Sequence, residues 1–293
     1  MKKFVCRLVA AVTIMIVVVA VMYLPSFFAV ERQIDDVYTI PHDTEVLFIG
    51  ASNVGYSIYN DPGLKMKIIW VSGTCPLSIL MRLRELERRR QLESVKVCII
   101  PIDITSFSAQ TNEKLNWALY KELPLSLRHS EMFPEGRLAF AAYILRNLRP
   151  RAPFAVTEEA PDRPGMPDNS ANHRDYIYRL MKKEATELVH LAEDTQEAAR
   201  RLLDCVERIK ELCDRHGIRL VAFRPPYLPS FRNSIPRSCW DEFYFYVKRL
   251  KDMSIEFVEM QLDLGEEYFF DHKHLTEAGA KIFTEKLIKE LHR

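Results

Sequence analysis

The chain has 293 residues, 48% of them hydrophobic, and its 41 basic and 40 acidic residues give a formal net charge of +1. This length and composition allow one large buried core or two modest ones, of which we expect one main domain with an insertion, and they argue against an intrinsically disordered chain. The near-neutral charge provides no basic footprint, so we expect no nucleic-acid partner.

The first thirty residues differ from the rest. Lys2, Lys3 and Arg7 precede an apolar run from Leu8 to about Val30, which is long enough to cross a bilayer. Basic residues on the amino side favour a cytoplasmic amino terminus, so residues 31–293 would lie on the extracytoplasmic, periplasmic or extracellular side. We therefore predict a membrane anchor at residues 1–30. A cleavable signal peptide has the same signature and is the alternative.

Short apolar runs along residues 31–293 are typical of buried strands. They lie at residues 45–49, 67–71, 95–101, 219–224 and 255–259. All but the last pair are separated by helical patterns or by a long insertion, and the longest helical pattern, 182–216, ends at Gly217. This alternation predicts an α/β fold with a parallel sheet and helices on both faces.

Two further segments have their own composition. Between about residues 106 and 180 the pattern loosens, and residues 149–170 contain five prolines. We expect an insertion over the carboxyl edge of the sheet, where it would set substrate specificity; a lid of no catalytic consequence or a flexible spacer is the alternative. The basic run 82–90 interleaves Leu and Glu, which is typical of the solvated face of an amphipathic helix.

The number and spacing of the cysteines predict no disulfide framework. Five lie beyond the first thirty residues, and an odd number cannot all pair within one chain. Cys205 and Cys213 are eight residues apart on one predicted helix, about 12 Å along its axis and beyond disulfide reach.

Candidate catalytic residues lie at both ends of the predicted domain. Ser52 follows the first strand-like run in a turn of small residues, and Asp271 and His274 form an Asp-x-x-His block before a helix with Thr276 as its N-cap. Open α/β sheets carry their sites at the carboxyl ends of the strands, where these residues can meet. Such a set provides a nucleophile, a base and an orienting carboxylate.

A metal site is the competing interpretation of the second block. Asp271, His272 and His274 are all residue types that bind metals. Beyond the two histidines, however, a third strong ligand is not evident, and catalytic zinc needs three. We therefore expect no metal and no cofactor, with His272 facing solvent or lying behind the catalytic residues.

These blocks resemble the SGNH/GDSL hydrolase superfamily, in which a Gly-Asp-Ser block follows the first strand and an Asp-x-x-His block precedes the last helix. The resemblance covers most of residues 44–290 and implies an SGNH-like three-layer α/β/α sandwich. It implies that Ser52 is the nucleophile, His274 the general base and Asp271 the residue that orients the histidine. It also implies that the backbone N–H groups of Ser52 and Gly73 bind the oxyanion.

The chain departs from the superfamily pattern in two places. Ala51 replaces the usual Asp before the serine, and residues 100–105 take the place of the Gly-x-Asn-Asp block whose asparagine donates to the oxyanion. Losing one such donor typically costs about 10²–10³ in rate. Asn53 follows Ser52, and we expect its side-chain amide to replace that donor in part.

Arg224, in the loop after the fourth strand-like run, is a candidate substrate-binding residue. A guanidinium binds an anionic group bidentately, whereas pairing with a nearby carboxylate is the structural alternative.

The resemblance implies a serine-dependent esterase or acyltransferase acting on acyl groups, chiefly acetyl, of an extracytoplasmic polysaccharide or cell-envelope glycan. An anchor joined to such a domain also resembles polysaccharide O-acetyltransferases and the D-alanyl-transfer proteins of teichoic acid, which implies a membrane-bound acyl-transfer partner. The alternative is a catalytically inactive SGNH-fold protein that binds glycan or a partner in a cell-envelope export or modification complex.

Overall fold

The computed structural model describes residues 13–14, 38–70, 76–107, 179, 181–182, 195–260, 262 and 264–291. The predicted anchor at 1–30 and the predicted insertion at 106–180 lie almost entirely outside the described residues, and both stay predictions. The chain divides into one unit of Met1–Thr39 with Glu122–Thr157 and a second of Ile40–Lys121 with Glu158–Arg293, to which the fold below belongs. No helix in the described ranges is long and apolar enough to cross a membrane.

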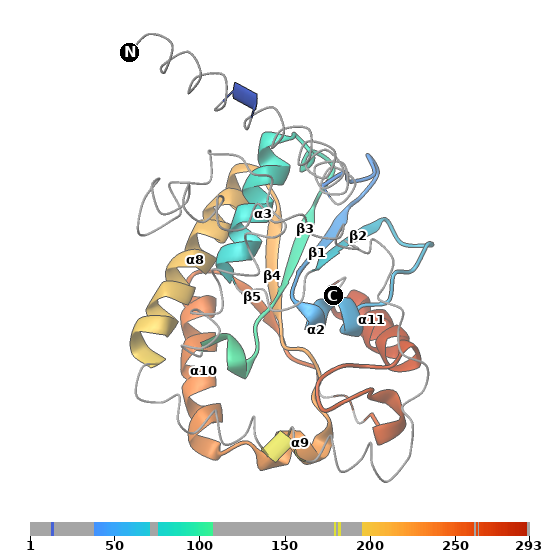
Figure 1. Ribbon diagram of the computed structural model, residues 1–293, viewed down its shortest axis with the longest axis vertical. Coiled ribbons are helices and arrows are strands. Elements are labelled where there is room, and N and C mark those ends of the chain that lie inside the picture. Colours follow the sequence, from blue (N-terminus) through green and yellow to red (C-terminus); the bar gives the residue numbers. More distant parts are fainter. Residues whose placement is uncertain are drawn as a thin grey trace. The chain divides into compact units, whose positions relative to one another are not determined.

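Strands and helices alternate along the second unit (Figure 1). The strands are β1 (Val46–Gly50), β2 (Met66–Trp70), β3 (Val97–Pro101), β4 (Arg219–Phe223) and β5 (Glu256–Val258). The helices are α2 (Ser52–Ser57), α3 (Pro76–Arg88), α8 (Thr195–Arg215), α9 (Pro229–Ser234), α10 (Arg237–Asp252) and α11 (Glu277–Leu291), with short 3₁₀ helices at Ile104–Phe107 and Glu266–Tyr268. Each predicted strand is present, within a few residues of its predicted bounds.

The strands form one parallel sheet in the order β2-β1-β3-β4-β5. Phe48 at the centre of β1 is in register with Ile68 of β2 on one side and with Ile99 of β3 on the other. The chain moves outward in opposite directions from β1, first to β2 and then to β3. Such a switch point opens a crevice at the carboxyl ends of the two central strands.

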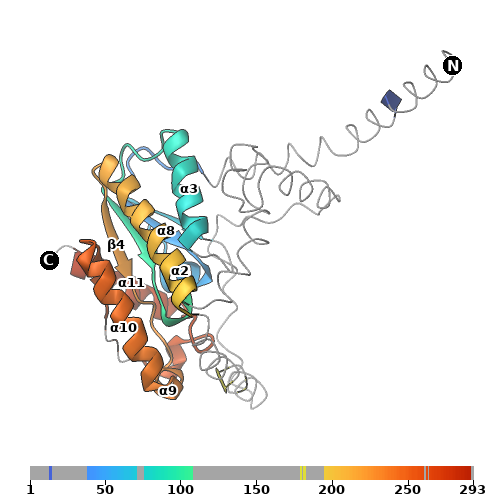
Figure 2. The same cartoon turned by 90° about the vertical axis from the view of Figure 1, so that its left-hand side faces the viewer.

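Helices cover both faces of this sheet, as predicted. Helices α3 and α8 pack against each other on one face, and α11 lies on the other face together with α2 (Figures 1 and 2). Right-handed crossovers place α2 on one face and α3 and α8 on the other, because the connection from β1 to β2 runs opposite to those from β2 to β3 and from β3 to β4. Strands β1, β3 and β4 are almost wholly buried, which explains their continuous apolar sequences.

Helix α8 ends where the sequence predicts. Gly217 adopts a left-handed conformation with φ of +66°, and the N–H of Ile218 donates to the carbonyl of Cys213. Glycine takes this conformation without steric strain, so it ends the helix and releases the chain into β4. The amino-terminal part of the predicted helix, residues 183–194, lies outside the described residues.

The helices between β4 and β5 are a correction, because the sequence pattern gave no helix there. Helix α10 spans 16 residues and buries Phe243, Tyr246, Val247 and Leu250. The segment 239–247 is rich in aromatic residues, which have weak helix propensity, so its local composition masks the spacing of three and four. The ring of Phe243 packs against Phe257 in β5, with centroids 6.0 Å apart, and such tertiary packing favours the helical conformation of α10.

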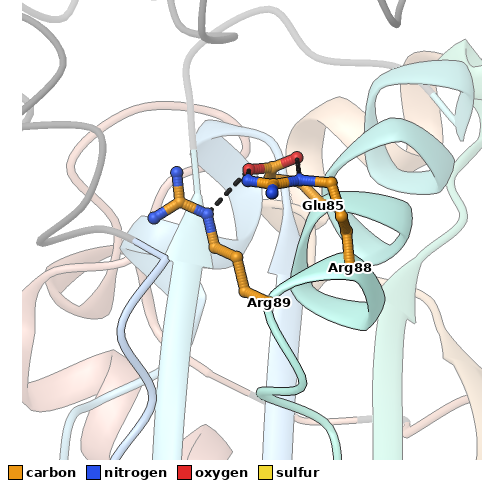
Figure 3. Close-up of polar contacts among 3 residues, drawn as sticks. All are labelled: Glu85, Arg88 and Arg89. Atoms are coloured by element: carbon orange, nitrogen blue, oxygen red, sulfur yellow. Dashed lines mark hydrogen bonds and ion pairs between the residues drawn. The ribbon is translucent and has the colours of Figure 1, made fainter.

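The basic run at residues 82–90 is less exposed than we expected from its charge. The carboxylate of Glu85 is buried, with 1% of its side chain exposed, and it accepts hydrogen bonds from the guanidinium groups of Arg88 and Arg89 (Figure 3). Burial acts to raise the pKa of Glu85, but the hydrogen bonds and charges of the two arginines lower it overall. Part of this expected solvated face is therefore a buried carboxylate, Glu85, paired with two arginines, of which Arg88 is half-exposed.

Candidate active site

Ser52 is placed at the switch point by the turn between β1 and α2. Strand β1 ends at Gly50, and Ser52 is the first residue of α2. A side-chain carbon at Gly50 would lie 2.6 Å from the ring of Pro101, in β3, and 2.7 Å from Val54. Only glycine lets the chain turn this closely over the neighbouring strand, so the sequence Gly-Ala-Ser delivers the hydroxyl to the carboxyl edge of the sheet.

Asp271 builds the loop that carries His274. Its Oδ1 accepts the backbone N–H groups of Lys273 and His274, each at 2.9 Å, and the N–H of Phe270 closes the loop by donating to the carbonyl of His274 at 2.8 Å. The predicted N-cap follows, with Thr276 Oγ1 accepting the N–H of Gly279 at 3.3 Å before the regular part of α11. The loop is therefore held by its own aspartate and by the helix behind it.

The three predicted residues meet at this edge. His274 Nε2 lies 3.1 Å from Ser52 Oγ, across 222 positions of sequence, and His274 Nδ1 lies 2.7 Å from Asp271 Oδ2. An ionised carboxylate only accepts hydrogen bonds, so the Nδ1 atom carries the proton and donates to Asp271. This tautomer leaves the Nε2 lone pair directed at the serine hydroxyl, which is the arrangement that a general base needs.

The charge state of Asp271 follows from its contacts. Burial of the carboxyl acts to raise its pKa, but the hydrogen bond and charge of His274 and the N–H of Lys273 outweigh it and lower the pKa from 3.8 to about 2. At neutral pH Asp271 is therefore ionised and able to stabilise an imidazolium that forms on His274.

The histidine packs against an aromatic cluster of Tyr56, Trp70 and Phe270 through Tyr56, a contact that the sequence analysis missed. The ring of Tyr56 lies 4.7 Å from that of His274, 6.0 Å from Trp70 at the end of β2 and 6.5 Å from Phe270. Trp70 lies directly over Gly55, where a side-chain carbon would come within 2.4 Å of the indole. Tyr56 follows Ser52 by four positions, and this helical spacing was the signal that predicts a shared face.

Asn53 and the loop after β3 are in contact. Asn53 Nδ2 donates to Oδ2 of Asp103 at 3.1 Å, and Asp103 lies where the resemblance places the missing asparagine block. The structure thus brings Asn53 to the correct edge of the sheet with part of its amide engaged. Gly73 lies outside the described residues, so the oxyanion roles of Ser52, Gly73 and Asn53 stay predictions.

Arg224 is paired with a nearby carboxylate, which was the structural alternative to substrate binding. It is 4% exposed, and its Nε lies 2.9 Å from Glu259 Oε1. The guanidinium carbon is 5.3 Å from the ring centre of Trp240 and 5.7 Å from that of Tyr227. These contacts hold the loop after β4 against α10, and a direct contact of Arg224 with substrate stays a prediction.

His272 does not face solvent, which corrects one of the two expected placements. It is only 3% exposed, and its ring packs edge-on against Phe231 of α9 at 4.6 Å. Its backbone carbonyl accepts the N–H of Leu228 at 2.9 Å. His272 therefore joins the loop of residues 270–274, which carries His274, to the loop after β4. The described residues contain no cluster of three or more His, Cys, Asp or Glu side chains arranged to hold a metal ion.

No protein-family model matches the chain, and no curated protein sequence matches it. Among solved structures, the chain is similar to a GDSL-like lipase from Bacteroides thetaiotaomicron, with 12% identity over 90% of this chain and 97% of that one and a TM-score of 0.47. It is also similar to an acetylxylan esterase from Geobacillus stearothermophilus, with 10% identity over 85% of this chain and 94% of that one and a TM-score of 0.35. These likenesses are remote.

Proposed function

We propose that the chain is a serine-dependent esterase or acyltransferase of the SGNH type. The observation that carries the proposal is the continuous relay from Ser52 Oγ to His274 Nε2 and from His274 Nδ1 to Asp271 Oδ2. A serine that only packs or caps a helix needs neither a histidine in this tautomer nor a partly buried, ionised carboxylate behind it.

The geometry supports a two-step mechanism. As Ser52 Oγ attacks the acyl carbonyl carbon, its proton passes to His274 Nε2, and the carbonyl electron pair moves onto oxygen to form a tetrahedral oxyanion. The oxyanion collapses to an acyl-serine and the leaving alcohol takes the proton from His274. Water or an acceptor hydroxyl then loses its proton to His274 and attacks the acyl carbon, and the second tetrahedral oxyanion collapses by releasing Ser52 Oγ, which takes the proton back from His274.

The substrate side of the proposal rests on the sequence. The apolar run 8–30 preceded by Lys2, Lys3 and Arg7 supports a membrane anchor and an extracytoplasmic domain. The polymers available on that side include acylated glycans, so we propose acetylated polysaccharide or cell-envelope glycan as substrate and a membrane-bound acyl-transfer protein as partner. The acceptor, water or a sugar hydroxyl, decides between hydrolase and transferase.

The full-length chain in detergent provides the test. Hydrolysis of p-nitrophenyl acetate and covalent labelling by a fluorophosphonate should both require Ser52 and His274, so Ser52→Ala and His274→Ala should abolish turnover, and Ser52→Ala should abolish labelling. Ser238→Ala and His216→Ala are the matched controls, because Ser238 is exposed and His216 precedes β4, at the opposite edge of the sheet, where its ring contacts Glu87. Turnover that survives both Ser52→Ala and His274→Ala would overturn the proposal.

One observation favours the alternative of an inactive glycan-binding protein. The loop after β3 presents Asp103, a carboxylate, at the place where the resemblance puts an oxyanion donor. An inactive protein would leave Ser52 unlabelled by the fluorophosphonate and still bind acylated oligosaccharides, whereas labelling of Ser52 rejects this alternative.

A further inference from the structure

Asp103 is held rigidly by its own loop. It is 5% exposed, and its Oδ1 accepts the backbone N–H of Ser106 at 2.9 Å and the hydroxyl of Ser106 at 3.0 Å. The N–H of Asp103 donates back to Ser106 Oγ at 3.0 Å. These reciprocal bonds fix the carboxylate at the end of β3, the strand beside β1, and leave Oδ2 directed away from the loop.

The second carboxylate oxygen determines which way the Asn53 amide faces. Oδ2 accepts from Asn53 Nδ2 at 3.1 Å, and a carboxylate can only accept, so the nitrogen must face Asp103. Asn53 Oδ1 is buried, and no donor among the described residues reaches it. An unsatisfied buried acceptor is unfavourable, yet the reversed amide would set two oxygens against each other. The amide is thus held in one orientation by Asp103.

We propose that Asp103 is a positioning residue that holds the Asn53 amide so that its second Nδ2–H donates to the oxyanion formed on the carbonyl that Ser52 attacks. The inference rests on the proposed function and extends it to a pair of residues. One Nδ2–H of the Asn53 amide donates to Asp103. The second Nδ2–H is left to donate elsewhere, and Asn53 directly follows Ser52, the nucleophile of the proposed function. A carboxylate at position 103 cannot itself donate to an oxyanion, but it can aim a neighbour that does.

These separate roles, Asp103 as the acceptor that orients the amide and Asn53 as the donor, give a physical account of the departure from the superfamily pattern. The resemblance places the oxyanion asparagine after the third strand, whereas here that position holds the acceptor and the amide lies on the helix of the nucleophile. In the tetrahedral step the carbonyl oxygen gains the electron pair and becomes an oxyanion. Because Asp103 already fixes the orientation of the Asn53 amide, the second Nδ2–H needs no reorientation to donate to that oxyanion.

A double-mutant cycle tests the inference with the full-length chain and p-nitrophenyl acetate. Asn53→Ala removes the donor and should lower kcat by about 10²–10³ with little change in KM. Asp103→Asn should lower kcat similarly, because the Ser106 N–H keeps an oxygen facing the loop and the new amide nitrogen forces the Asn53 amide to reverse. If both act through one N–H, the variant carrying Asp103→Asn and Asn53→Ala should be no slower than Asn53→Ala alone.

A second double variant separates positioning from simple structural support. Asn53→Asp combined with Asp103→Asn restores an N–H···O bond between the two residues in the reverse sense but removes the amide donor beside Ser52. We expect its thermal midpoint to return towards that of the wild type while kcat stays at least as low as in the single variants. Recovery of kcat together with the midpoint would show that the pair only supports the fold, and would overturn the inference.

The outcomes also distinguish this inference from the proposed function. Activity that requires Ser52 but changes less than threefold in Asn53→Ala, or effects that add fully in the cycle, would overturn the role of Asp103 and leave the esterase proposal standing. Activity and fluorophosphonate labelling that do not require Ser52 would overturn both.

Discussion

The ring of Tyr56 lies against the imidazole of His274, with centroids 4.7 Å apart and planes tilted by 49°. Tyr56 is itself packed between Trp70 and Phe270, so the imidazole rests on a fixed aromatic surface while Asp271 holds its Nδ1. The histidine is therefore positioned by two independent contacts, one apolar and one polar.

The aromatic contact can be tested at Tyr56. Tyr56→Phe keeps the ring and should leave kcat within about threefold, whereas Tyr56→Ala removes the surface and should lower kcat about 10²-fold by misplacing the base. Tyr244→Ala, an exposed position on α10, is the control. Equally large losses of kcat in Tyr56→Phe and Tyr56→Ala would show instead that the hydroxyl of Tyr56 is the important group.

The polar contact can be tested at Asp271. Asp271→Asn should lower kcat about 10⁴-fold, because the amide can donate to Nδ1 and so favour the tautomer that has no lone pair facing Ser52. The rate of fluorophosphonate labelling should fall in parallel. Labelling at the wild-type rate would mean that the relay inferred from the 2.7 Å contact does not activate Ser52.

The pKa of Asp271 predicts a stability change in acid. Its folded pKa of about 2 lies below the ordinary 3.8, so the ionised form stabilises the fold; the full effect, about 2 kcal/mol, is present above about pH 4 and is lost as the pH falls through 2. Urea unfolding of the wild type and of Asp271→Asn should show a larger difference in unfolding free energy at pH 5 than at pH 2. A difference that is constant across this range would contradict the shift.

Arg224 should affect stability more than substrate affinity. Arg224→Gln leaves Glu259 without its buried partner and should lower the unfolding free energy by about 3 kcal/mol with KM unchanged. Arg237→Gln, at an almost fully exposed arginine that begins α10, should change neither quantity. A raised KM at unchanged stability would support the substrate-binding role predicted from the sequence.

The turn before the nucleophile should not tolerate a side chain. Gly50→Ala places a carbon against Pro101 and should lower the unfolding free energy by about 1–3 kcal/mol, together with activity, because Ser52 moves with the turn. Gly63→Ala is the matched control, since its added carbon would meet only the flexible end of the Asp61 side chain. Comparable losses in thermal midpoint for both variants would show that close packing at Gly50 is not what requires glycine.

The parts of this protein that were predictable from the sequence are those that local patterns encode. Buried strands have continuous apolar runs, and Gly217 stops a helix whatever surrounds it, so the sheet and the end of α8 were predicted correctly. The proximity of Ser52, Asp271 and His274 was predictable because each lies in a short block next to a strand end or a helix start, and their catalytic roles stay a proposal. Helix α10 was missed because its aromatic residues obscure the period that tertiary packing selects.

The contacts that the sequence did not reveal depend on partners far away in the chain. The burial of Glu85 and of His272 depends on the elements that cover them, which a charged or polar run does not indicate. Asp103 was visible as part of the segment that replaces the asparagine block, but its bond to Asn53 joins residues 50 positions apart. Orientation of a side-chain amide is a property of the assembled edge of the sheet and of no single segment.

The two carboxylate oxygens of Asp271 have different tasks, and this affects how the site can change during evolution. Oδ1 holds the backbone of the histidine loop and Oδ2 holds the imidazole, so replacement of Asp271 disturbs the fold and the chemistry together. Ser52 has no such double duty, since its hydroxyl contacts His274 and its exchange for alanine leaves that loop intact. If the proposed serine chemistry were not in use, little structural restraint would keep Ser52, which makes that hydroxyl the most sensitive record of whether the proposed chemistry operates.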